Sequence, residues 1–131
     1  MVEIKNARAL KLFFDGGCRP NPGMMETAVA ARGRIWHRPA IGHGTNDEAE
    51  WQALLDALDV ASGLGAPDVV LLGDSAMVVA QASGTLGPRP AFARFHARFQ
   101  EQATRFTRIR IRRINRTQNL AGIALAKAWP R

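Results

Sequence analysis

Three acidic residues of the chain stand where carboxylates can do chemistry. Asp15 follows the apolar run LKLFF, Asp74 ends the run DVVLLGD, and Glu50 lies near the start of a helical pattern. Acids at the carboxyl ends of neighbouring strands, with a third on an adjacent helix, can converge on one point. Convergent carboxylates repel one another unless divalent cations neutralise them, and magnesium prefers such oxygen ligands. Two such ions can activate water and stabilise the leaving oxygen in phosphodiester hydrolysis.

A simpler interpretation of the same residues stays open at this point. Aspartate often forms turns, which is a sufficient role for Asp15, and it often caps helices, which is a sufficient role for Asp74. Spacing alone does not choose between a metal site and these structural roles.

The elements that would position these acids follow from hydrophobic periodicity. Period-2 or continuous apolar runs predict strands, and apolar residues three and four apart predict helices. The expected strands are residues 10–14, 27–31, 34–40, 68–74 and the alternating segment RFTRIRIRR, and the expected helices lie within residues 45–65, 75–81, 90–103 and 117–129. A first strand ending at residue 14 would carry Asp15 at its carboxyl end. This order indicates a mixed sheet with helices packed on it.

Several local signals support these elements. Arg32 and Gly33 form a predicted hairpin turn, Thr45 or Asp47 can cap the long helix, and Ser75 can cap the next one. Trp51 falls on the apolar stripe of the long helix, so we expect it in the core rather than in contact with a ligand. Phe92, Phe95 and Phe99 make a similar stripe on the third helix.

Length and composition place the chain among folded proteins. It has 131 residues, 47% hydrophobic and 22% charged, which fits one domain over residues 1–131 with a packed core. A single cysteine, Cys18, excludes an intrachain disulfide, and the lack of Cys/His pairs at ligand spacing excludes a structural zinc site. No secretory signal or membrane span is recognisable, so we expect a cytoplasmic protein.

The charge balance indicates a polyanionic partner. The net charge is +7, and residues 102–131 contain eight Arg or Lys and no Asp or Glu. Candidate phosphate contacts are Arg108, Arg110, Arg112, Arg113 and Arg116. A solvated strand face that carries arginines for solubility is an equally open interpretation.

Four segments together resemble the type 1 ribonuclease H family: FFDGGCRPNPG, GTNDEAEWQAL, LLGDS and RTQNLAGIALA, in this order over nearly the whole chain. The resemblance implies a ribonuclease H-like α/β fold, with a five-stranded mixed sheet in the order 3-2-1-4-5 and helices on both faces. It also implies hydrolysis of the RNA strand of RNA/DNA hybrids with two magnesium ions. We further expect a monomer in which manganese can substitute for magnesium.

By this resemblance, Asp15 matches the aspartate that bridges both metals, Glu50 the helix glutamate, and Asp74 the aspartate that ends the fourth strand. Glu48 is better explained as a capping-box partner of the helix. The expected substrate-binding residues are Cys18, Asn21, Thr45, Asn46, Ser75, Arg116 and Asn119.

Three departures from the family pattern leave the activity open. Ile123 stands where a fourth catalytic acid is expected, although the register here could slip by a residue or two, and Asn119 could contribute a neutral oxygen instead. The connection INRT lacks the histidine that many bacterial members carry, and SGTLGPRP is too short for a basic protrusion. The sequence therefore allows an endonuclease with reduced activity, a catalytically silent nucleic-acid-binding domain, or an interaction domain without nucleic acid.

Overall fold

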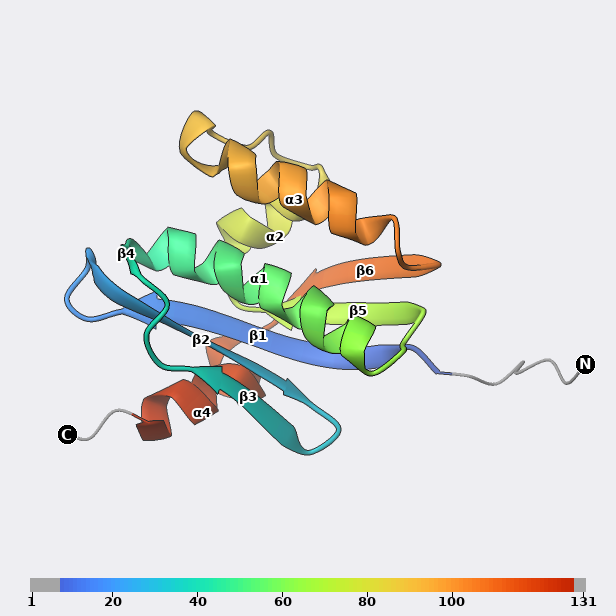
Figure 1. Cartoon of the computed structure of the whole chain (residues 1–131), viewed down its shortest axis with the longest axis horizontal. Helices are drawn as coiled ribbons and strands as arrows, with labels where there is room; N and C mark the ends of the chain where they lie inside the picture. Colours follow the sequence, from blue (N-terminus) through green and yellow to red (C-terminus); the bar gives the residue numbers. More distant parts are fainter. Residues whose placement is uncertain (1–7, 129–131) are drawn as a thin grey trace, which may run out of the picture.

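The computed structural model describes residues 8–128, which form a mixed α/β structure (Figure 1). Its strands are β1 (Leu10–Cys18), β2 (Gly23–Ala31), β3 (Arg34–Arg38), β4 (His43–Gly44), β5 (Asp68–Gly73) and β6 (Arg108–Arg113). Its helices are α1 (Asn46–Gly63), α2 (Ala76–Ser83), α3 (Ala93–Ala103) and α4 (Leu120–Ala128), with short 3-10 turns η1 (Pro90–Phe92) and η2 (Arg116–Gln118).

The main strands lie in the order β3-β2-β1-β5-β6, which confirms the predicted order 3-2-1-4-5. The numbers differ because the two-residue strand β4, which pairs with β2, was not predicted. β2 is antiparallel to β1 and β3, whereas β1, β5 and β6 are mutually parallel where they pair. The sheet is therefore mixed, as expected.

Helices cover both faces of the sheet, also as expected. α1, α2 and α3 lie on one side and α4 on the other (Figure 1). The larger core includes Leu12, Phe14 and Trp51, and Trp51 is fully buried as its helical position predicted. Asp56 ties α1 to the sheet because it accepts hydrogen bonds from the Thr27 hydroxyl at 2.6 Å and from Arg38 at 2.8 Å.

The first strand is longer than predicted. β1 continues through Asp15 to Cys18, so Asp15 lies inside a strand and not at its end, and the turn predicted from residue 15 begins only after Cys18. Of the two glycines that suggested a turn, Gly16 serves close packing instead. A Cβ at Gly16 would overlap the backbone carbonyl of Ala49, so glycine lets α1 lie directly against β1. β2 accordingly starts earlier than predicted, because Met25 and Glu26 pair with this extension and Gly23 and Met24 pair with β4.

Other element boundaries differ less. β3 ends at Arg38 rather than residue 40, and α2 extends two residues beyond its predicted end. The predicted last helix is divided into η2 and α4 because Asn119 between them is extended, and its predicted end at Trp129 lies outside the described residues. The Arg32–Gly33 turn is confirmed by φ values of 52° and 74°.

The predicted helix caps are present. Thr45 caps α1 and forms a capping box with Glu48, which confirms the structural interpretation of that glutamate. Ser75 caps α2 through the backbone N–H of Val78. Within the described part of the chain, no helix has the length and apolar character needed to cross a membrane.

Candidate active site

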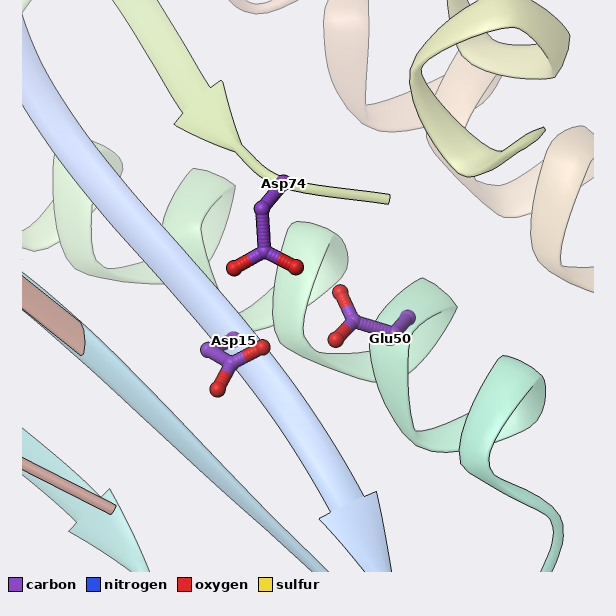
Figure 2. A group of neighbouring side chains, drawn as sticks. All are labelled: Asp15, Glu50 and Asp74. Carbon is purple, nitrogen blue, oxygen red and sulfur yellow. The ribbon is translucent and has the colours of Figure 1, made fainter. Parts of the chain in front are cut away.

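The structure brings the three predicted acids together (Figure 2). Asp15 comes from the middle of β1, Asp74 follows the end of β5, and Glu50 comes from the first turns of α1. One carboxylate oxygen of each residue lies within 4.8 Å of the other two. Parallel pairing of β1 with β5 and the close packing of α1 at Gly16 make this convergence possible.

Glu50 is the most deeply placed of the three acids. Its Oε1 accepts a hydrogen bond from the Gly16 N–H at 3.4 Å, while its Oε2 is buried and has no hydrogen-bond donor. Burial raises the pKa of Glu50 well above its ordinary value, and the neighbouring carboxyl groups of Asp15 and Asp74 raise it further. A buried acceptor without a donor is costly, so this oxygen is suited to an added cationic partner.

Asp15 has a raised pKa for the same main reason. Burial is the largest cause, and the charge of Asp74 adds to it. Hydrogen bonding with Glu50 and with the Gly16 backbone opposes the rise, as does the charge of Arg116. The cluster therefore holds more negative charge than its protein surroundings stabilise. Three carboxylate groups that repel one another are suitable ligands for a hard divalent cation such as magnesium.

Asn119 orients one of these acids from inside the fold. It is fully buried, and its Nδ2 donates to Asp74 Oδ2 at 2.9 Å and to the Phe14 carbonyl at 3.0 Å. Its Oδ1 accepts from the Ala121 N–H at 3.1 Å, at the start of α4. The amide oxygen, which the sequence offered as a substitute metal ligand, is thus turned toward the α4 backbone and the amide nitrogen toward Asp74.

α4 brings no acid to the cluster. The motif puts Ile123 at the position of the fourth carboxylate, but in the structure the Ile123 side chain is 40% exposed and the cavity beside the acids is lined by Gly122. A Cβ at Gly122 would lie 3.1 Å from Asp15 Oδ2. The position that faces Asp15 therefore differs by one residue from the motif alignment.

A cavity of about 610 Å³ surrounds the acids, and several of the predicted substrate-binding residues line it. These are Cys18, Asn46, Ser75 and Arg116. Asn21 does not line the cavity but accepts a hydrogen bond from the Asn46 N–H at 3.1 Å. Asn46 in turn accepts from the Cys18 N–H at 2.9 Å. The two remaining predicted residues, Thr45 and Asn119, do not line the cavity. Thr45 caps α1, and Asn119 donates a hydrogen bond to the Phe14 carbonyl.

Sequence reasoning assigned no site role to three charged residues that line this cavity, Arg19, Glu26 and Asp47. Glu26 is 6% exposed and pairs across the sheet with Gly17, on the same face as Asp15. Its place was hidden because the predicted second strand began at residue 27. Alternation carried back from Ala28 would have put Glu26 on this face.

A mixed sheet in the order β3-β2-β1-β5-β6, with acids from β1, α1 and the end of β5 around one cavity, defines a ribonuclease H-like α/β protein. The family model described as reverse transcriptase-like matches residues 27–129. The chain belongs to this family. Its ribonuclease H-like fold agrees with the resemblance that the four sequence segments indicated.

Individual relatives support this assignment. Ribonuclease HI of Halobacterium salinarum is 35% identical over 132 residues, covering 96% of this chain and 66% of the relative. The crystal structure of RNase H1 from the same organism matches with a TM-score of 0.81 at 31% identity, over 90% of this chain and 94% of that one.

A second relative is the bifunctional protein of Mycobacterium tuberculosis, 34% identical over 119 residues and 86% of this chain. The solved N-terminal RNase H domain of the M. tuberculosis protein has a TM-score of 0.76 at 30% identity, over 93% of this chain and 99% of that one. The chain spans about a third (33%) of the length of the whole mycobacterial protein.

Proposed function

We propose that the chain is a metal-dependent endoribonuclease that cleaves the RNA strand of RNA/DNA hybrids. The observation that carries this proposal is the convergence of Asp15, Glu50 and Asp74 within 4.8 Å, with Glu50 Oε2 buried and without a donor. Membership of the family and similarity to a ribonuclease HI support the choice of substrate. The proposal includes one ribonuclease H-like domain acting as a cytoplasmic monomer.

The three carboxylates would hold two magnesium ions, for which manganese could substitute. Bound ions of this kind supply a hydroxide nucleophile and stabilise the leaving oxygen. The chain's own residues orient the carboxylates: the Gly16 N–H holds Glu50 Oε1, and the Asn119 amide holds Asp74 Oδ2. Arg116 adds a positive charge beside Asp15, in position to attract a phosphate.

The proposed substrate contacts are the polar residues that line this cavity, together with those that hold the lining in place. Cys18, Asn46 and Ser75 present small polar groups next to the acids. Asn21 and Thr45 hold the start of α1, where Asn46 is placed. Polar groups of this size suit the 2′-hydroxyl and phosphate contacts by which RNA is distinguished from DNA.

One observation favours a second candidate function, a catalytically silent domain that binds nucleic acid. α4 presents Gly122 to Asp15, and Ile123 occupies the position of the fourth acid in the family motif, so neither residue supplies a carboxylate. A site with three carboxylates binds divalent ions more weakly than one with four, because fewer charged oxygens hold the metal. The two candidates share the fold and differ only in turnover.

The experiment that tests the proposal is cleavage of a labelled RNA/DNA hybrid in magnesium and in manganese. Asp15→Asn run in parallel detects contaminating host nuclease, and single-stranded RNA and duplex DNA test specificity. Hybrid-specific cleavage that is lost in Asp15→Asn supports the endonuclease. Hybrid binding without cleavage in either metal contradicts it and supports the silent domain.

A further inference from the structure

The two faces of β6 carry different chemistry. Ile109 and Ile111 are partly buried and pack against the larger core, on the side of the sheet where α2 contacts β6. Because successive side chains of a strand alternate, Arg108, Arg110 and Arg112 project from the opposite face of the sheet. We call these three residues the arginine row.

The face that bears the arginine row is the one on which α4 lies. α4 packs over β1, β2 and β3, where Ala121 and Leu125 contact Ala28 and Ala30. Over β5 and β6, Arg108 and Arg112 are exposed, and the side chain of Arg110 is about one-third exposed at 31%. Arg108 and Arg112 are thus available at the surface beside α4, whereas the Nε of Arg110 is buried and has no hydrogen-bond partner.

Two buried apolar residues of β5 share the face of the arginine row. Val70 and Leu72 of β5 point to the same face, yet they are only 7% and 9% exposed. Register places Val70 between Lys11 and Arg110, and Leu72 next to Arg112. Aliphatic stems of long cationic side chains cover apolar neighbours while their charged ends stay in water, so these stems shield the two residues.

The positive charge of this face is mostly uncompensated. Arg110 donates to Asp68 Oδ1 at 3.4 Å. Within residues 8–128, Arg108, Arg112 and Lys11 have no carboxylate at ion-pair distance. Arginines two positions apart on one strand repeat about every 6.6 Å, so the face presents a line of cations.

This line begins beside the candidate active site. Arg113, the last residue of β6, pairs with Gly73, and its Nε donates to the Asp74 carbonyl at 3.4 Å. Asp15 projects from the same face of the sheet, toward Gly122 of α4. From Arg112 to Arg108 the row runs back along β6 for about 13 Å. A polyanion seated at the acids can therefore continue along the arginine row.

We propose that the arginine row binds the sugar-phosphate backbone of the nucleic acid beyond the cleavage site. The inference rests on the proposed function, because it takes nucleic acid as the partner. Guanidinium groups bind phosphates through paired N–H donors, and a linear cationic face complements a linear polyanion. This surface adds affinity without sequence preference, since phosphates carry no base identity.

The test is the salt dependence of hybrid binding for the doubly substituted protein Arg108→Gln, Arg112→Gln. Fluorescence anisotropy with a long labelled hybrid in EDTA measures binding while cleavage is prevented. The control, Arg32→Gln, Arg34→Gln, removes the same charge from the β2–β3 hairpin, at the opposite edge of the sheet. Glutamine removes the charge but keeps most of the aliphatic part of the arginine side chain that covers Val70 and Leu72. A third protein, Arg108→Lys, Arg112→Lys, restores the charge.

Each phosphate contact contributes roughly 0.7 to 0.9 to the slope of log K against log salt. We expect the row variant to lower that slope by about 1.4 to 1.8 and to weaken binding by about 25- to 60-fold at 0.1 M salt. The hairpin control should retain wild-type slope and affinity, and the lysine variant should recover most of the loss.

Equal losses in the row variant and the hairpin control would overturn the inference, because net charge alone would then explain them. So would an unchanged row variant, or a wild-type protein that does not bind the hybrid. The outcome is separate from that of the proposed function. A row variant that loses affinity in a protein without cleavage sustains the inference and contradicts the endonuclease, whereas cleavage with an unchanged row variant does the reverse.

Discussion

At the scale of single residues, the acidic cluster is defined by burial as much as by charge. Glu50 is 9% exposed, and one of its oxygens has no donor. Asn119, which the sequence suggested as a substrate contact or metal ligand, is fully buried and orients Asp74. The sequence indicated that Glu50 and Asn119 belong to the site. The direction of the Asn119 amide, however, depends on the Phe14 carbonyl, 105 residues away.

The raised pKa of Glu50 predicts a specific pH dependence of stability in the metal-free protein. A glutamate whose pKa is higher in the folded state stabilises the fold fully below its unfolded pKa, near 4.3, and this contribution is lost as pH rises through the folded pKa. We therefore expect the free energy of unfolding to fall across that range. Glu50→Gln should reduce the fall, as measured by urea unfolding in EDTA at several pH values.

Glu101→Gln serves as the matched control for this experiment, because Glu101 is an exposed glutamate on α3. The control should keep the wild-type pH profile. If Glu50→Gln and Glu101→Gln give the same profile, burial of Glu50 is not the cause.

At the scale of elements, the contact between α1 and β1 determines where Glu50 lies. Gly16 and Gly17 are adjacent in β1 but have different surroundings. A Cβ at Gly16 would overlap the Ala49 backbone, whereas a Cβ at Gly17 would meet only Asn46 Oδ1 at 3.6 Å, an ordinary contact. The pair therefore offers a comparison of close packing within one strand.

Gly16→Ala should destabilise the protein by about 3 kcal/mol, because α1 must move away from β1. Gly17→Ala should change stability by less than about 1 kcal/mol. Thermal or urea unfolding measures both values. Similar losses in the two proteins would mean that the helix does not approach β1 at Gly16.

The start of α4 determines which residue faces Asp15, and the prediction concerns a restored fourth acid. Gly122→Asp should tighten magnesium binding by about tenfold, or roughly 1.4 kcal/mol, because it adds a charged oxygen ligand beside Asp15. Ile123→Asp should change it by less than about twofold, since Ile123 is 40% exposed and does not line the cavity.

Titration calorimetry with magnesium measures both affinities, and Gly122→Ala separates the added charge from the added bulk. A larger gain in Ile123→Asp than in Gly122→Asp would favour the register of the sequence motif over that of the structure.

At the scale of the whole molecule, metal binding and folding should be linked. The carboxylates repel one another in the folded protein and are far apart in the unfolded chain, so ions that bind the cluster stabilise the fold. Magnesium at 100 times its Kd should add about 2.7 kcal/mol to the free energy of unfolding. Asp15→Asn should lose most of this gain.

Differential scanning calorimetry in magnesium chloride, compared with sodium chloride at equal ionic strength, measures this effect. An equal rise in Tm in both salts would show general screening of the +7 net charge instead of a metal site.

What the sequence determined by itself was most of the helices and main strands and the three acids. Periodicity and capping signals are local, so α1, α2, β5 and β6 were predicted near their observed positions, and the motifs identified Asp15, Glu50 and Asp74. The strand order followed from the family resemblance.

Only the tertiary structure decided how these pieces meet. β1 continues past Asp15 because Gly16 packs on α1 and because residues 15–18 pair with β2. The turn of Asn119 toward Asp74, the approach of Gly122 to Asp15 and the exposure of the arginine row all depend on residues distant in the chain. Local sequence patterns do not record such contacts, since the partner of each group is chosen by packing.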